Sequence, residues 1–102
     1  MISASITNAL RKSVYRRDHF RCVLCDSTDG LQIHHAIPRG EGGSNSPQNL
    51  VSLCWRCHGV IHGGYEWHIG DRITSEEAAQ LCVEYLADYY PDDRHVWNPW
   101  EK

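Results

Sequence analysis

The chain has 102 residues, enough for one domain, and a domain of this size buries only roughly 60 to 70 per cent of its unfolded surface. Its core needs further stabilisation, and the surplus of five Cys and seven His over one Met and one Phe makes bound metal the first candidate. No apolar run approaches the roughly 18 residues of a membrane span, and residues 1–7 lack the basic flank and hydrophobic stretch of a secretory signal. We therefore expect a cytoplasmic protein that does not contact membranes.

The net charge of −3 would argue against a nucleic-acid partner if it were spread evenly, but it is not. Seven basic and four acidic residues give residues 1–65 a net charge of +3, whereas three basic and nine acidic residues give residues 66–102 a net charge of −6. We therefore expect a modestly basic module in the first part. The second part is predicted to be an acidic C-terminal helix and tail, packed on the same domain.

The first predicted element is an amphipathic helix from about Ser3 to Arg16. Its apolar residues recur at every fourth position, and basic residues occupy the other faces. The apolar positions are Ile2, Ile6, Leu10 and Val14.

A strand is predicted over residues 31–37, after a Cys-x-x-Cys turn, and it ends at Pro38. Side chains alternate between the two faces of a strand. One face carries Leu31, Ile33, His35 and Ile37, and the other carries Gln32, His34 and Ala36. Residues 39–48 follow, rich in Gly, Ser and Asn, and form a loop of the length that compact domains usually reserve for function.

Two further helices are predicted. A short apolar run, residues 50–53, leads into a helix that holds residues 54–62 and is stopped by two glycines. The sequence Thr74-Ser75-Glu76-Glu77 is a capping box, which opens a helix from about Ser75 to Tyr89 that ends at Pro91.

Four of the five cysteines form two Cys-x-x-Cys pairs, Cys22 with Cys25 and Cys54 with Cys57. A tetrahedral zinc site needs four thiolates from two such turns, and in a reducing compartment these pairs hold metal more often than they form disulfides. The 28 residues between the pairs leave room for the predicted strand and loop. We expect a structural Zn²⁺, since four thiolates leave no open coordination position for chemistry.

Four histidines lie inside or beside this framework. His58 and His62 lie four positions apart and so project from one helix face, where they could bind a single ion. A third nitrogen could come from His34 or His35. Because neighbours on a strand point to opposite faces, one of these two would serve as ligand and the other as base.

The run Ile33-His34-His35-Ala36-Ile37-Pro38-Arg39-x-Glu41-Gly42-Gly43, followed by Asn49-Leu50 and Cys54-x2-Cys57-His58-x3-His62, resembles a known family. It is similar to the HNH (His-Asn-His) endonucleases of the ββα-metal, or His-Me finger, superfamily, in the branch that carries a four-cysteine zinc. The resemblance implies a small α+β fold with a ββα-metal core stapled by zinc and flanked by N-terminal and C-terminal helices. Residues 1–65 would form the nuclease module, of a kind found in bacteria and phages.

The resemblance also implies roles for individual residues. His35 corresponds to the general base, and Asn49 to the motif's central Asn, which braces the loop and so orients that base. His34, His58 and His62 correspond to the ligands of the catalytic divalent ion, and His58 belongs to the catalytic set as well. Gln32 stands where some relatives have a Glu that contacts the base, so we expect weaker support for His35. Candidates for DNA phosphate contacts are Arg16, Arg17, Arg39 and Arg56.

The function predicted from the sequence is metal-dependent hydrolysis of DNA phosphodiester bonds, leaving 5′-phosphate and 3′-hydroxyl ends. The catalytic ion would be Mg²⁺, Mn²⁺, Ni²⁺ or Zn²⁺. One alternative is a non-catalytic zinc module that binds nucleic acid or protein, which has no need for a base and three ligands. Another is a phage packaging accessory, active only beside a terminase-like partner that contacts the acidic C-terminal part.

Overall fold

The computed structural model describes residues 6–65, 67 and 73–91, without the side chain of Arg39. The elements in chain order are α1 (Asn8–Arg17), β1 (Gln32–His35), the 3-10 helices η1 (Arg39–Glu41) and η2 (Pro47–Asn49), β2 (Leu50–Leu53), α2 (Trp55–Ile61) and α3 (Ser75–Tyr89). This is the small α+β architecture that the sequence predicted. Among the described helices, none is long and apolar enough to cross a membrane.

The helix α1 begins later than the apolar spacing predicts. It starts at Asn8 because the hydroxyl of Thr7 accepts a hydrogen bond from the backbone N–H of Leu10 at 3.1 Å, which caps the helix. The predicted start at Ser3 is therefore wrong, since Ile6 and Thr7 are not helical; residues 1–5 lie outside the described part. Val14, the last residue of the predicted apolar stripe, is fully buried.

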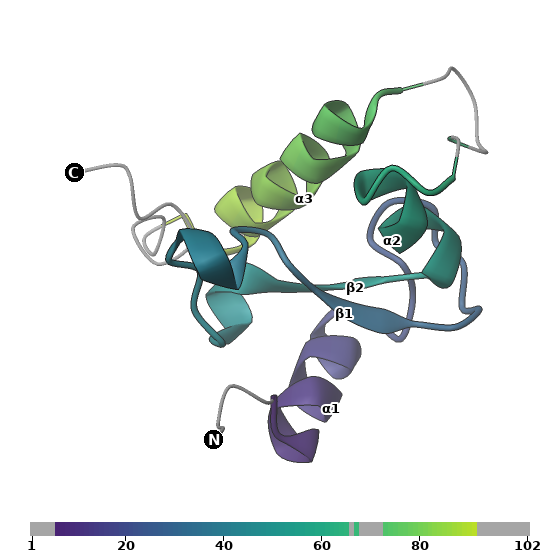
Figure 1. The fold of residues 1–102 in the computed structure, drawn as a ribbon. Helices are drawn as coiled ribbons and strands as arrows, with labels where there is room; N and C mark the ends of the chain where they lie inside the picture. The colour runs from purple at the N-terminus through teal and green to yellow at the C-terminus, as the bar shows by residue number, and fades with distance from the viewer. Residues whose placement is uncertain (1–5, 66, 68–72, 92–102) are drawn as a thin grey trace.

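The two strands pair antiparallel, with Gln32 opposite Leu53 and His35 opposite Leu50. The first strand is shorter than the predicted 31–37, because its partner begins only at Leu50. Beyond β1 the backbone bonds to Asn49 instead of to a strand. All four residues of β2 are buried, since α1 lies on one side of the sheet and α2 and α3 lie on the other (Figure 1).

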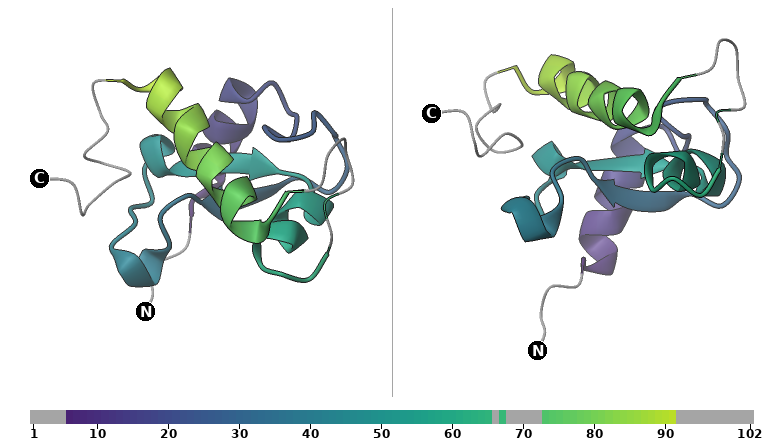
Figure 2. Two further views of the ribbon diagram at one scale, coloured as in Figure 1. Left: turned by 90° about the horizontal axis from the view of Figure 1, so that it is seen from above. Right: turned by 45° about the horizontal axis from the view of Figure 1, so that its top comes forward.

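The helix α3 has the bounds that its capping box predicts, and both hydrogen bonds of the box are present. Its buried residues Cys82 and Leu86 pack in the core with Cys22, Val51 and Leu53. Ser75 at its start donates a hydrogen bond from Oγ to the backbone oxygen of Val60 in α2, at 2.7 Å. The two helices therefore pack together above the sheet (Figure 2).

A buried ion pair at the end of α1 joins three elements. Asp18 accepts hydrogen bonds from Arg17 Nε at 2.7 Å, from the backbone N–H of Ser52 at 2.9 Å and from the Tyr85 hydroxyl at 2.6 Å. Arg17 also donates to the backbone oxygens of Pro47 at 2.7 Å and Leu50 at 2.6 Å. The pair thus fixes α1 and α3 to the start and middle of β2.

Candidate active site and metal centres

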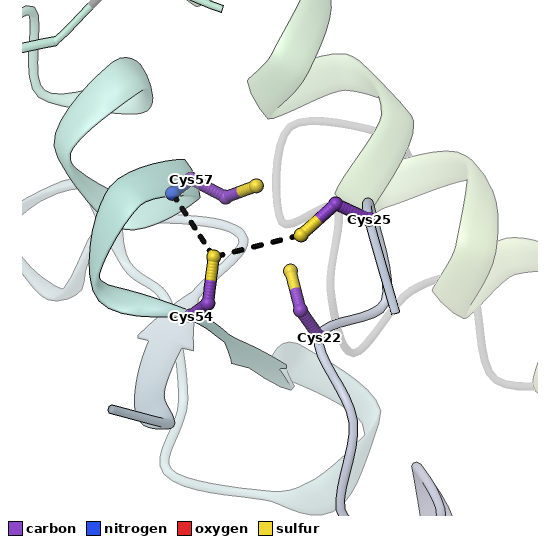
Figure 3. A group of neighbouring side chains, drawn as sticks. All are labelled: Cys22, Cys25, Cys54 and Cys57. Atoms are coloured by element: carbon purple, nitrogen blue, oxygen red, sulfur yellow. Dashed lines mark hydrogen bonds between the residues drawn. The ribbon is translucent and has the colours of Figure 1, made fainter. Parts of the chain in front are cut away.

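The four paired cysteines converge between the turn before β1 and the start of α2, and together they form the cysteine cluster (Figure 3). The first pair lies on a tight turn in which Asp26 has a φ of 65°, and the backbone N–H of Asp26 donates to the backbone oxygen of Cys22 at 2.9 Å. In the second pair, Cys54 is the N-cap of α2, and its Sγ accepts from the backbone N–H of Cys57 at 3.4 Å.

The sulfurs of the cysteine cluster all lie within 4.8 Å of one another, and Cys25 Sγ is 3.6 Å from Cys54 Sγ. A hydrogen bond from the Cys57 thiol lowers the pKa of Cys22 to about 5, whereas burial raises the pKa of Cys25 to about 11. Four thiolates this close repel one another unless a cation neutralises them. The donor set and its spacing therefore fit a tetrahedral Zn²⁺.

A second group, the histidine cluster, consists of His34 on β1, His58 in the middle of α2 and His62, the C-cap residue of α2. Its candidate ligand atoms also lie within 4.8 Å of one another, and the Nε2 atoms of His58 and His62 are 3.0 Å apart. His34 is buried, and its Nε2 has no hydrogen-bond partner among the described residues. A buried polar atom without a partner is costly, so it indicates a missing ligand.

The surroundings of His34 and His58 favour the neutral form of the imidazole, which is the form that binds metal. Burial, together with the charges of the neighbouring histidines, lowers the pKa of His34 to about 3. Burial and His62 also lower the pKa of His58. A neutral imidazole has a free lone pair, so the histidine cluster fits a divalent cation with positions left open for substrate and water.

Gln32 supports a different histidine from the one that the sequence predicts. Its Oε1 accepts a hydrogen bond from Nδ1 of His58 rather than contacting His35. Gln32 and His34 lie two residues apart on one face of β1, the face toward α2, whereas His35 lies on the other. The contact leaves Nε2 of His58 as the nitrogen nearest His62. Such a hydrogen bond is typical of a metal-ligating histidine.

His35, the last residue of β1, borders the same open cleft as the histidine cluster. The cleft has a volume of about 300 Å³ and is lined by Ile33, His34, His35, Pro38, His58 and His62. The Nε2 atom of His35 lies 2.7 Å from Oδ1 of Asn45. Sequence reasoning missed Asn45, and its only signal was a place in the Gly-, Ser- and Asn-rich loop.

Asn49 is fully buried and clamps the chain after β1 to that loop. Its Oδ1 accepts from the backbone N–H of Ile37 at 2.8 Å, and its Nδ2 donates to the backbone oxygens of Ile37 at 3.0 Å and Ser44 at 2.9 Å. Gly43 lies so close that a Cβ there would be 1.7 Å from the Ile37 oxygen. The loop is thus held against the end of β1.

The four arginines predicted to contact phosphate are not equivalent. Arg16 on α1 and Arg56 on α2 are exposed, and Arg56 stacks over the Trp55 ring at 4.9 Å from its centroid. The guanidinium of Arg17, by contrast, is buried and bonded to Asp18 and two backbone oxygens. The side chain of Arg39 lies outside the described part.

Comparison with known proteins places this site in a family. Residues 22–64 match the family model described as HNH endonuclease. A relative from Nostoc sp. (strain PCC 7120), described as Anaredoxin, is 36% identical over 55 residues, which are 53% of this chain and 72% of that protein. The Type IV methyl-directed restriction enzyme EcoKMcrA of Escherichia coli (strain K12) is 41% identical over 39 residues, 38% of this chain.

The match to the restriction enzyme covers only 14% of that protein. No solved structure matches the chain significantly. The family match, by contrast, spans both cysteine pairs, His34, His35, Asn49 and the two histidines of α2. Together with the four neighbouring cysteines, this match and the coverage of the Nostoc relative show that the chain belongs to the HNH endonuclease family.

Proposed function

We propose that the protein is a metal-dependent endonuclease that hydrolyses DNA phosphodiester bonds and leaves 5′-phosphate and 3′-hydroxyl ends. The observation that carries the proposal is the cleft, in which His34 lies with His58 and His62 beside a fourth histidine. The buried Nε2 of His34 has no hydrogen-bond partner in the part of the chain that the structure describes. Membership of the HNH family supports phosphodiester hydrolysis as the reaction of this arrangement. DNA as substrate is supported by the restriction enzyme relative.

His35 would act as the general base. Imidazole is the side chain whose ordinary pKa lies nearest neutrality, so it can take a proton from an attacking water under physiological conditions. The ring borders the cleft, and one of its nitrogens is already engaged with Asn45. A positioned general base contributes about 10² to 10⁴-fold to a rate.

The histidine cluster would hold the catalytic cation. A divalent ion held by these residues would supply Lewis-acid chemistry, which would polarise a phosphoryl oxygen and stabilise the leaving 3′ oxygen. His34 contributes a neutral, buried nitrogen, and Gln32 fixes the ring of His58. The exposed Arg16 and Arg56 remain candidates for phosphate contacts, and the cysteine cluster would hold a structural Zn²⁺.

Cleavage of supercoiled plasmid with Mg²⁺, Mn²⁺ or Ni²⁺ tests the proposal on the wild type and on His35→Ala. We expect metal-dependent cleavage by the wild type and a loss of about 10² to 10⁴-fold in the variant, the contribution of a general base. The control is His19→Asn, an exposed histidine with a φ of 61°, which Asn tolerates. This control should cleave like the wild type.

Equal cleavage by the wild type and His35→Ala would contradict the proposal. So would a folded wild type that cleaves nothing with any of these ions. If such a protein binds DNA and carries zinc alone, it is the non-catalytic zinc module. If cleavage starts only when a terminase-like partner is added, the packaging role is favoured instead.

A further inference from the structure

We propose that Asn45 is a positioning residue that sets the tautomer of His35 and leaves Nδ1 of that ring to accept the proton. The contact itself is independent of any reaction, but its catalytic consequence rests on the nuclease function proposed above. The hydrogen bond joins two residues that are ten apart in the sequence, one at the end of β1 and one in the loop of residues 39–48.

The chemistry of the contact decides the tautomer. Oδ1 of Asn45 is a carbonyl oxygen and only accepts hydrogen bonds, so the Nε2 of His35, 2.7 Å away, must carry the proton. In a neutral imidazole the other nitrogen then has the lone pair. That nitrogen is Nδ1, on a ring that lines the cleft with the histidine cluster.

Asn45 can fix a ring only if it is itself fixed, and the loop provides this on both sides. The preceding residue, Ser44, is held through its backbone oxygen by Nδ2 of Asn49 at 2.9 Å. The side chains of Ser44 and Ser46 are hydrogen-bonded to each other at 2.7 Å, which closes the backbone around Asn45. The residue is therefore presented from a braced turn.

Asn49 also holds Ile37, two residues beyond His35, through two hydrogen bonds to its backbone. One buried amide thus holds both segments, the one that carries the base and the one that carries its partner. The brace from Asn49 therefore reaches His35 through this loop, and Asn45 makes the last contact. The loop that is rich in Gly, Ser and Asn then serves to hold Asn45 against His35.

Nitrogen-15 NMR of the imidazole rings tests this in the full-length, zinc-loaded protein. The variants are Asn45→Ala and Asn45→Asp, and the signals of His35 are identified by their loss in His35→Ala. Spectra recorded at about pH 8, above the ordinary pKa of imidazole, report the neutral ring. We expect a protonated Nε2 on His35 in the wild type, a shift toward protonated Nδ1 in Asn45→Ala, and the wild-type tautomer in Asn45→Asp, which keeps the acceptor.

Cleavage kinetics supply the second readout. We expect kcat to fall about tenfold in Asn45→Ala, the change that corresponds to one hydrogen bond, with KM within about twofold of the wild type. Asn45→Asp should restore most of kcat. The control Asn8→Ala removes an exposed asparagine at the start of α1 and should change neither readout.

A wild-type tautomer in Asn45→Ala would overturn the inference, and so would a fall in kcat without a tautomer change. Protonated Nδ1 in the wild type would overturn it as well. If the proposed nuclease function is wrong, the cleavage assay will show no cleavage by the wild type. In that case the NMR spectra alone still decide whether Asn45 sets the ring of His35.

Discussion

At the scale of single residues, the clamp between Asn49 and Gly43 controls the loop beside the cleft. A buried amide can donate and accept at once, which lets Asn49 satisfy three backbone groups without a charge. Gly43 allows the loop backbone to approach the Ile37 oxygen, where a side chain has no room. The position of Asn45, and through it that of His35, depends on both.

We predict that Gly43→Ala destabilises the loop. The added methyl would collide with backbone rather than with a flexible side chain, so the loop must shift. We expect a loss of about 1 to 3 kcal/mol in the free energy of unfolding, measured by denaturant titration, and weaker cleavage. Gly40→Ala is the matched control, because nothing lies within 4 Å of a Cβ at that position. Equal stability of the two variants would contradict the clamp.

At the scale of elements, the end of α1 is the point where the helices are joined to the sheet. Arg17 donates two hydrogen bonds to Asp18, at 2.7 and 2.9 Å. Arg17 also donates to the backbone of β2, and Asp18 also accepts from Tyr85 in α3. Removing one partner of a buried pair leaves the other uncompensated, which costs more than the pair contributes. The pair therefore specifies how α1 and α3 sit on the sheet.

We predict that Arg17→Met destabilises the protein by about 2 to 4 kcal/mol, since Asp18 and the oxygens of Pro47 and Leu50 lose their donor. Arg16→Met, one residue earlier and exposed, should change stability by less than about 0.5 kcal/mol. Thermal and denaturant unfolding of the two variants measures the difference. Similar unfolding of both would show that Arg17 is not a structural residue.

The elements also show what the sequence can and cannot predict. The bounds of α3 follow from local signals, the capping box at Thr74 and Pro91, so they were predictable. The start of α1 was not, because Ile6 continues the apolar spacing beyond the Thr7 cap. The sequence does not distinguish Arg17 from the exposed Arg16 that precedes it. Only the fold shows that the backbone oxygens of Pro47 and Leu50 lie beside Arg17.

The candidate site also contains features that the sequence predicts and features that it does not. The cysteine pairs and the pair His58 and His62 follow from fixed spacings along the chain, and the family resemblance singled out His34. The structure thus brings together residues that the sequence had already indicated. The partners of those residues depend on contacts between distant segments. Neither the contact of Gln32 with His58 nor that of Asn45 with His35 has a spacing rule that could reveal it.

At the scale of the whole molecule, α2 connects the two clusters. Cys54 and Cys57 at its start belong to the cysteine cluster, and His58 and His62 toward its end belong to the histidine cluster. A structural zinc contributes about 10 to 16 kcal/mol of apparent binding free energy, comparable with the whole stability of a small domain. The cysteine cluster would therefore hold the helix that carries the catalytic ligands.

A structural zinc and a separate catalytic ion can be told apart by metal stoichiometry, measured by native mass spectrometry. We predict that the wild type holds one Zn²⁺ and binds one further Mn²⁺ or Ni²⁺. His58→Ala should keep the zinc and the fold but lose the second ion, whereas Cys54→Ser should lose both ions and unfold. A wild type that binds only one metal ion, or a His58→Ala variant that loses its zinc, would show that the two clusters do not hold separate ions.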